Sequence, residues 1–376
     1  MPAFVKCILA ISLLFTATGC WDEMNLQKIS YISALGVDFV DDHYVVYAQL
    51  VSFGSIAKKE QGSISKNPIW IGTQKGDTPL HAMFNLMNSS QYILTLDHLK
   101  TIIVHERAFS RLTAILEGLN RMRATRYTTY VFGTKDNLDK VLTIDSFFES
   151  SPLTSVMFDP SIVYEENNFV KATRMEDIVR LAFEPGMTLL MPNLKSNGKE
   201  WTNDDKQMNL VTIDGVFAFK NNLFKGFFPK NEVKGLGWRS ENFQRQIVTV
   251  NAKDEPKNTA SVVLTKGEMK IRWDARKSVF RLRGDYMGHI VEWNPEFNFV
   301  SIVSTVEAKI KEQIKSTYKI GLDYGVDLFP LEHELYRYHN SKWKELKRQG
   351  EWMPNADELL IDINVSLSHS GEIEVH

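Results

Sequence analysis

The chain has 376 residues, of which 24% are charged and 43% hydrophobic, and its mean hydropathy is −0.23. This composition is ordinary for a folded globular chain and excludes a protein built mainly of membrane spans. The formal net charge of −2 excludes the broad basic surface that nucleic-acid binding requires. The length predicts two or three domains, each stabilised by a packed core.

The first nineteen residues have the pattern of a secretory signal peptide. Lys6 is followed by a short apolar run, and the small residues Ala17, Thr18 and Gly19 stand directly before Cys20. Because a membrane span needs about 20 apolar residues, this run is too short to be one. We therefore expect residues 1–19 to be removed as a signal peptide.

Cys20 is predicted to carry the membrane anchor. The chain has two cysteines, and Cys7 lies in the segment that is removed, so the mature chain keeps one cysteine with no internal partner. An unpaired cysteine in an exported protein needs an explanation, and lipidation of Cys20 provides it. Two or more acyl chains, at about 0.8 kcal/mol per buried CH₂, make such an anchor effectively permanent.

The first part of the mature chain alternates strand and helix patterns. Residues 29–40 and 44–53 predict a hairpin. Thr78 followed by Pro79 predicts a helix start. Thr173 and Glu176 predict a capping box, with Pro185-Gly186 as the stop. The further predicted elements are strands at 99–104 and 128–132, and helices from Ser110, at 136–144 and at 175–183. This order indicates helices packed on a sheet.

A polar segment, residues 196–206, predicts a domain boundary, and the pattern then changes to strands followed by helices. Asn221-Asn222 predicts the turn of a hairpin, because asparagine tolerates left-handed backbone geometry. Residues 299–321 show the apolar repeat of a long amphipathic helix. The other predicted elements are strands at 210–219, 223–228, 246–251, 260–265, 268–273, 278–283 and 359–367, and a helical stretch at 331–349.

The predicted organisation is therefore a mixed α/β and α+β fold with mixed sheets and packed helices. Its parts are the signal peptide at 1–19, an N-terminal α/β domain at 20–200, a small central β-rich domain at 207–255 and a C-terminal α+β domain at 256–376.

No clear catalytic or metal-binding pattern stands out. His333 and His339, with Glu332 and Glu334 nearby, lack the i, i+4 spacing of a helical metal site, which favours a solvated helix surface. Asp323 and Asp327 lack the other oxygen ligands of a calcium loop. Gly235-Leu-Gly237 lacks the third glycine of a dinucleotide fingerprint. We expect no cofactor and no enzymatic activity, and a surface hydrolase has no identifiable nucleophile.

Two segments each have two interpretations, one in which they contact a membrane or an acidic surface and one in which they only stabilise the fold. Trp21 follows Cys20 and either lies in the lipid headgroup region, where an indole is favoured, or packs into the first domain. The cations of residues 342–348 either contact an acidic surface or face water while Trp343 and Leu346 lie in the core, and the second reading is favoured.

Three blocks of sequence resemble the Ger(x)C lipoproteins, the C subunits of spore germinant receptors. The first block is Gly19-Cys20-Trp21-Asp22 with Leu35-Gly36-Val37-Asp38 after it. The second is residues 214–228, beginning Asp-Gly-Val-Phe-Ala-Phe-Lys. The third runs from Asp327 through Tyr336, Trp343 and Trp352 to the strand 361–365. The three blocks occur in the family's order and span nearly the whole mature chain. The resemblance implies a three-domain architecture.

The resemblance also implies a function. The chain is expected to be a non-enzymatic receptor subunit, required for nutrient-triggered spore germination, on the outer surface of the spore's inner membrane. Its expected partners are the A and B membrane subunits of the receptor and, through Cys20, the bilayer. The alternative is a solute-binding lipoprotein of a transporter. It predicts two similar lobes, whereas the patterns before and after residue 200 differ.

Overall fold

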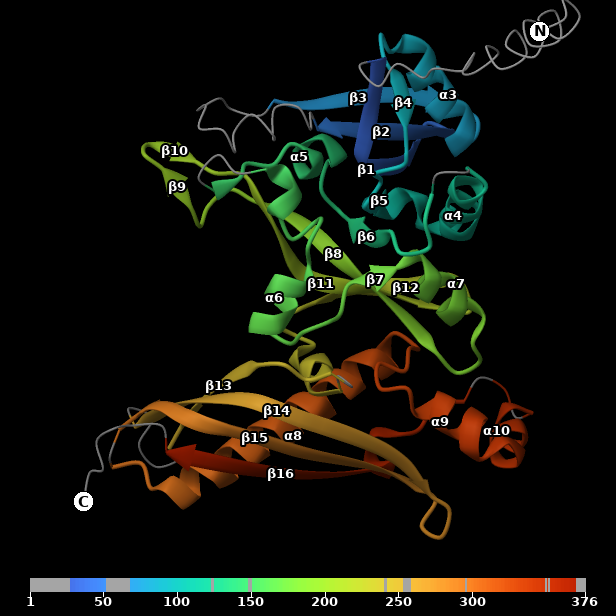
Figure 1. Ribbon diagram of the computed structural model, residues 1–376. Coiled ribbons are helices and arrows are strands. Elements are labelled where there is room, and N and C mark those ends of the chain that lie inside the picture. Colours follow the sequence, from blue (N-terminus) through green and yellow to red (C-terminus); the bar gives the residue numbers. More distant parts are fainter. Residues whose placement is uncertain are drawn as a thin grey trace, which may run out of the picture.

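Two β-sheets, stacked one above the other in Figure 1, form the framework of the protein. The computed structural model describes residues 28–51, 68–122, 125–147, 151–239, 242–252, 258–294, 296–348, 350 and 352–369. The upper sheet has ten strands and the lower sheet has four. The predicted mixed fold, with mixed sheets and packed helices, is confirmed.

The ten-stranded sheet is mixed. Its order is β12-β11-β8-β6-β5-β1-β2-β3, with β4 paired to β1 and β7 paired to β6. Neighbours are parallel from β1 through β5 and β6 to β8, and the hairpins at either side are antiparallel. The strands are β1 (Ile29–Val40), β2 (His43–Val51), β3 (Ile69–Gly76), β4 (Ile93–Thr95), β5 (Thr101–His105), β6 (Tyr130–Thr134), β7 (Thr173–Arg174), β8 (Thr188–Asn197), β11 (Leu210–Lys220) and β12 (Leu223–Pro229).

Both predicted hairpins of this sheet are confirmed. β1 and β2 are joined at Asp41 and Asp42, and β11 and β12 at Asn221 and Asn222. All four turn residues have positive φ, between 51° and 63°. Asparagine and aspartate are the residues that reach this region most easily after glycine, which explains why the turns could be predicted.

Helices cover both faces of the ten-stranded sheet. Helices α3 (Pro79–Ser89), α4 (Leu112–Asn120) and α7 (Met175–Phe183) bury apolar side chains in the core of one face, and α5 (Leu138–Leu142) does so on the other. The remaining short helices of this part are η2 (Glu106–Arg111), η4 (Pro152–Thr154) and α6 (Ser161–Glu166).

The predicted helix starts have different outcomes. Thr78 caps α3, since its hydroxyl accepts the His81 N–H at 3.0 Å. The predicted capping box of α7 is one residue out of register. The carboxylate of Asp177 accepts the Arg174 N–H at 3.1 Å, whereas the Thr173 hydroxyl donates to the carbonyl of Leu190 in β8.

The lower sheet has the order β13-β14-β15-β16, and α8 packs against it (Figure 1). Ile302, Val306, Ile310 and Ile314 of α8 recur at four-residue spacing and are fully buried, each worth about 1.5–3 kcal/mol. The elements are β13 (Gln246–Asn251), β14 (Thr259–Asp274), β15 (Val279–Trp293), β16 (Leu359–His369), α8 (Phe299–Asp323), α9 (Leu331–Tyr338), α10 (Asn340–Lys347), η5 (Lys234–Arg239) and η6 (Ala356–Glu358).

Two segments of this part differ from their predictions. Residues 260–265 and 268–273 belong to the single strand β14, whose pairing with β15 shifts register between Leu264 and Lys266. The helical stretch at 331–349 is two helices, because His339 leaves the helical conformation at φ −137° between α9 and α10.

Strand pairing crosses the boundary predicted near residue 200. β8 and β11 pair from Asn197 opposite Leu210 to Thr188 opposite Lys220. The connection between them contains a small two-stranded sheet of β9 (Thr202–Asn203) and β10 (Lys206–Gln207). The predicted central segment 207–255 is divided between the two sheets, since β11 and β12 join the upper one and β13 the lower one.

β11 contributes to two of the three hydrophobic cores. Phe217 and Phe219 lie in the core under α4, whereas Val216 and Ala218 lie in the core that contains α8. This follows from the alternation of side chains along a strand. The alternation also directs Lys220, two residues beyond Ala218, toward the C-terminal part.

Candidate functional site

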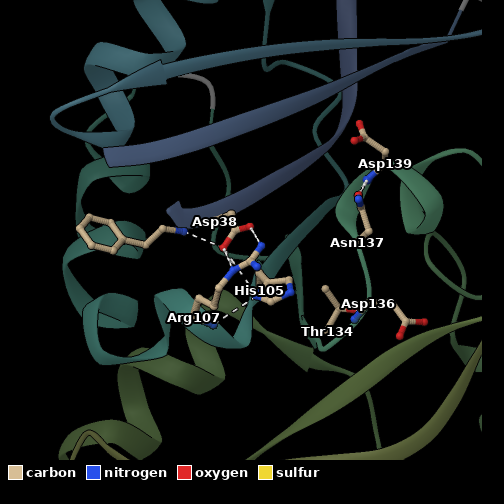
Figure 2. Close-up of polar contacts among 8 residues, drawn as sticks. Asp38, His105, Arg107, Thr134, Asp136, Asn137 and Asp139 are labelled. Carbon is tan, nitrogen blue, oxygen red and sulfur yellow. Dashed lines mark hydrogen bonds and ion pairs between the residues drawn. The ribbon is translucent and has the colours of Figure 1, made fainter. Parts of the chain in front are cut away.

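The first candidate site is a polar cluster of Asp38, His105 and Arg107, here called the Asp38 cluster (Figure 2). Asp38 lies near the end of β1, and His105 is the last residue of β5. Because the two strands are parallel, with Val37 opposite Val104, their carboxyl ends meet at one edge of the sheet. Arg107 follows in η2. The sequence thus brings one acid and two bases to the edge where open α/β sheets commonly bind ligands.

Asp38 is bonded on both carboxylate oxygens. Its Oδ1 accepts the Phe39 N–H at 2.7 Å and the Arg107 Nε–H at 3.1 Å, and its Oδ2 accepts from Nη2 of Arg107. The carboxylate is almost fully buried, whereas the guanidinium reaches the surface. The hydrogen bond to Asp38 raises the pKa of Arg107 above its ordinary value. This bidentate pair holds the end of β1 against η2.

His105 accepts a hydrogen bond rather than donating one at Nδ1. The Arg107 N–H donates to this nitrogen at 3.2 Å, while Asp38 Oδ1 lies 3.6 Å away. Burial lowers the pKa of His105, which outweighs the opposite influence of Asp38. A neutral ring with Nδ1 as acceptor fits this geometry. The bonded groups of the Asp38 cluster are therefore used to fix two strand ends, which is a structural role.

The end of β6 lies at the same edge and is also bonded within the protein (Figure 2). The Thr134 hydroxyl donates to the Leu194 carbonyl at 2.7 Å and accepts the Asp136 N–H at 3.1 Å. The Asp136 carboxylate accepts the Ser196 N–H at 2.8 Å. These bonds join β6 to β8 and occupy the polar groups that a ligand would otherwise bind.

The second candidate site is a buried ion cluster, here called the Glu332 cluster, formed by Lys220, Glu332, Trp343 and Lys347. Lys220 Nζ lies 3.2 Å from Glu332 Oε2, and the two side chains are 4% and 2% exposed. Lys347 Nζ lies 2.7 Å from Oε1, which also accepts the Trp343 indole N–H at 3.3 Å. The contact between Lys220 and Glu332 is an ion pair rather than a hydrogen bond, because Glu332 Oε2 accepts no hydrogen bond. The cluster joins the end of β11 to α9 and α10.

Asp327 orders the backbone at the start of α9. Its two oxygens accept the N–H groups of Phe329 at 3.0 Å and of Glu332 at 2.9 Å. Burial, with a smaller effect of the Glu332 charge, raises the pKa of Asp327 to about 7. Glu332 lies in the first turn of α9, so the Asp327 carboxylate satisfies one N–H group that has no partner within the helix, although Asp327 lies three residues before the N-cap position of Pro330.

Two further contacts tie α9 to its surroundings. His333 Nδ1 lies 3.1 Å from the carbonyl oxygen of Pro185 and 3.7 Å from the carboxylate of Glu184, in the loop between α7 and β8. Glu334 lies 3.5 Å from Arg272 in β14. α9 thus contacts strands or loops of both sheets, which makes it one of the polar connections between the upper and lower parts.

The predicted site residues have different outcomes. Cys20 and Trp21 lie outside the described residues, so lipidation and the position of Trp21 stay predictions. The solvated surface predicted around His333 and His339 is wrong for Glu332 and Glu334, which are buried. No group of three or more His, Cys, Asp or Glu residues positioned for a metal occurs within the part of the chain that the structure describes.

Other sequence features find structural roles. Asp327 orders the backbone before and at the start of α9. Trp343 and Leu346 pack against the core as predicted, but Lys347 reaches the buried Glu332 rather than facing water. Gly235 and Gly237 are needed for close contact, because a Cβ atom would lie 2.5 Å from the Gln313 carbonyl oxygen at Gly235 and 2.3 Å from the Asn168 carbonyl oxygen at Gly237.

Comparison with known proteins identifies the family. Residues 22–196 match the "Spore germination protein N-terminal domain", and residues 214–371 match the "Spore germination B3/ GerAC like, C-terminal" domain. The chain belongs to this Ger(x)C spore germination family. The two matches divide between residues 196 and 214, close to the predicted boundary, although the β8–β11 pairing crosses it.

Relatives from Bacillus subtilis (strain 168) match over nearly their whole length. Spore germination protein A3 is 25% identical, with 98% of this chain and 97% of the relative covered. Spore germination protein KC is 21% identical (95% and 94%), and spore germination protein B3 is 20% identical (96% and 96%). The crystal structure of the GerBC protein has the same fold, with a TM-score of 0.52 at 16% identity, covering 89% of this chain and 96% of that one.

The three blocks that carry the resemblance place residues in the two clusters. The first block ends at Asp38, the second includes Lys220, and the third contains Trp343. These residues hold strand ends and helices together. In this chain, these residues of the three blocks therefore have structural roles.

Proposed function

We propose that the chain is the lipid-anchored C subunit of a spore germinant receptor, acting through protein–protein contacts with the A and B membrane subunits. The observation that carries this proposal is the pair of adjacent family matches from residue 22 to residue 371. The full-length relatives are named as spore germination proteins, which supports the same role. The subunit is proposed to be non-catalytic and to bind no cofactor.

The proposed anchor is the acylated Cys20, on the outer surface of the spore's inner membrane. The signal-like segment before Cys20 and the absence of a partner cysteine in the mature chain support it. No helix within the described ranges is long and apolar enough to cross a membrane. We also propose that Trp21 lies in the headgroup region.

The alternative of a solute-binding lipoprotein is not favoured. It predicts two similar lobes, but the two sheets differ in strand number, strand order and the pattern of parallel pairs. A protein with two different sheets fits a subunit that contacts two different partners.

The test is complementation in spores that lack the gene. Restoring the wild-type gene should restore germination with at least one nutrient, and Cys20→Ala should leave the protein folded but release it from the membrane fraction. Normal germination of the deletion strain with every nutrient would contradict the receptor role. Membrane retention of Cys20→Ala would place the anchor elsewhere.

A further inference from the structure

Helix α3 and the segment at the start of β4 expose large apolar side chains that belong to none of the three hydrophobic cores. Leu80, Phe84, Tyr92 and Ile93 are 38%, 53%, 54% and 56% exposed. Leu80 and Phe84 lie on one face of α3 because they are four residues apart. The opposite face, with Ala82, Met83 and Leu86, is buried. We call these four exposed side chains the α3–β4 surface.

The segment that carries this surface lacks side chains that are permanently charged at neutral pH. The nineteen residues from Thr78 to Leu96 contain no Asp, Glu, Lys or Arg, whereas the chain's 24% charged content would give about four or five. A helix that faces water normally carries charges on its outer face. Exposed apolar groups in an uncharged segment indicate a surface that is covered in the assembled protein.

The α3–β4 surface lies beside the point where the anchored arm joins the fold. β4 pairs in parallel with the start of β1, with Ile93 opposite Ile29 (Figure 1). The nine Cα-to-Cα steps from Cys20 to Ile29 span about 30 Å at most when the chain is fully extended. An acyl anchor on Cys20 therefore keeps this corner of the molecule near the bilayer, while the lower sheet lies at the opposite end of the molecule.

We propose that the α3–β4 surface docks on the lipid bilayer, with Phe84, Tyr92 and Ile93 in the interfacial region. The proposal rests on the acylation of Cys20 put forward above. Tyrosine is enriched at membrane interfaces, and an uncharged apolar surface can enter that region without burying charge. Docking fixes the orientation of the protein, which a single point of attachment at Cys20 leaves open, and it presents the lower sheet away from the membrane.

The test uses spin labels on the full-length acylated protein in vesicles of phosphatidylethanolamine and phosphatidylglycerol. Because Cys20 carries the acyl group and Cys7 is removed, Ile93→Cys introduces the one free thiol of the mature chain. Ile247→Cys in β13 is the matched control, since Ile247 is 58% exposed and belongs to the lower sheet. Phe84→Cys is a second reporter on the α3–β4 surface.

Collision rates of the nitroxides with oxygen, which dissolves in lipid, and with a water-soluble nickel chelate are then compared. The expected result is a several-fold higher oxygen-to-nickel ratio at positions 84 and 93 than at position 247. Equal ratios at all three positions in protein that floats with the vesicles would overturn the docking proposal alone. Wild-type protein that fails to float would overturn the anchor as well.

Discussion

Removing the charge of Glu332 is predicted to destabilise the contact between β11 and α9. Glu332→Gln keeps the size of the side chain but leaves the Lys220 ammonium, 4% exposed, without its counter-charge at 3.2 Å. Breaking a buried ion pair by neutralising one partner costs about 3–5 kcal/mol. The matched control is Asp285→Asn, whose partner Arg283 is largely exposed, and its cost is expected to be about 0–1 kcal/mol.

Hydrogen exchange of backbone amides, measured by mass spectrometry, is the suitable assay because it reports local opening rather than global unfolding. In the Cys20→Ala background, Glu332→Gln should lower the protection of residues 331–347 strongly, and Asp285→Asn should leave it near the wild-type level. Replacing both of the most buried partners, in Lys220→Met with Glu332→Leu, should restore part of the protection, because neither of these two charges is then left buried and Lys347, which is 26% exposed, can reach water. Equal loss of amide protection at residues 331–347 in Glu332→Gln and Asp285→Asn would show that the buried ion pair does not stabilise this contact.

Three further predictions concern Asp327, the Asp38 cluster and η5. Burial raises the pKa of Asp327 to about 7, so the folded state binds the Asp327 proton more tightly than the unfolded state does. This difference stabilises the folded state by at most about 4 kcal/mol, an amount that is fully present below about pH 4 and is lost as the pH rises through 7. Asp327→Asn should therefore remove part of the fall in the free energy of unfolding between pH 5 and pH 8; an unchanged slope in urea titrations would contradict this. Arg107→Ala should cost about 3 kcal/mol or less, since Asp38 keeps its backbone bond, and should increase hydrogen exchange in η2; unchanged exchange there would show that the pair does not hold this edge. Gly235→Ala should lower the melting temperature, because its Cβ would lie 2.5 Å from the Gln313 carbonyl oxygen, whereas Gly118→Ala, with open space around it, should not; equal effects would contradict the close contact.

Local patterns predicted much of the fold. The Asn221-Asn222 turn, the Thr78 cap of α3 and the four-residue repeat of α8 each depend on neighbouring residues, and each occurs as predicted. The misassigned details are also local. In the capping box of α7, the acidic residue is Asp177 rather than Glu176. His339 divides a predicted helical stretch into two helices, although the helical periodicity of the sequence continues through it.

The clusters could not be predicted in the same way. Glu332 resembled a solvated helix residue because its partner Lys220 lies 112 positions earlier in the chain and only the fold brings the two together. The available signal was Lys220 itself, a charged residue at the end of the apolar run Phe217-Ala-Phe219. Strand β8 gave no clear strand pattern, since Pro192 is disfavoured in the middle of a sheet.

Crosslinking in intact spores is the measurement that tests the receptor role most directly. A photocrosslinking amino acid can be placed at exposed positions of the upper sheet, which the proposed anchor keeps near the bilayer, such as Trp70 in β3, in the acylated full-length protein. The account predicts crosslinked products that contain the A or the B membrane subunit, and their loss in the Cys20→Ala variant. Products that contain neither membrane subunit, from every exposed position tested, would contradict it.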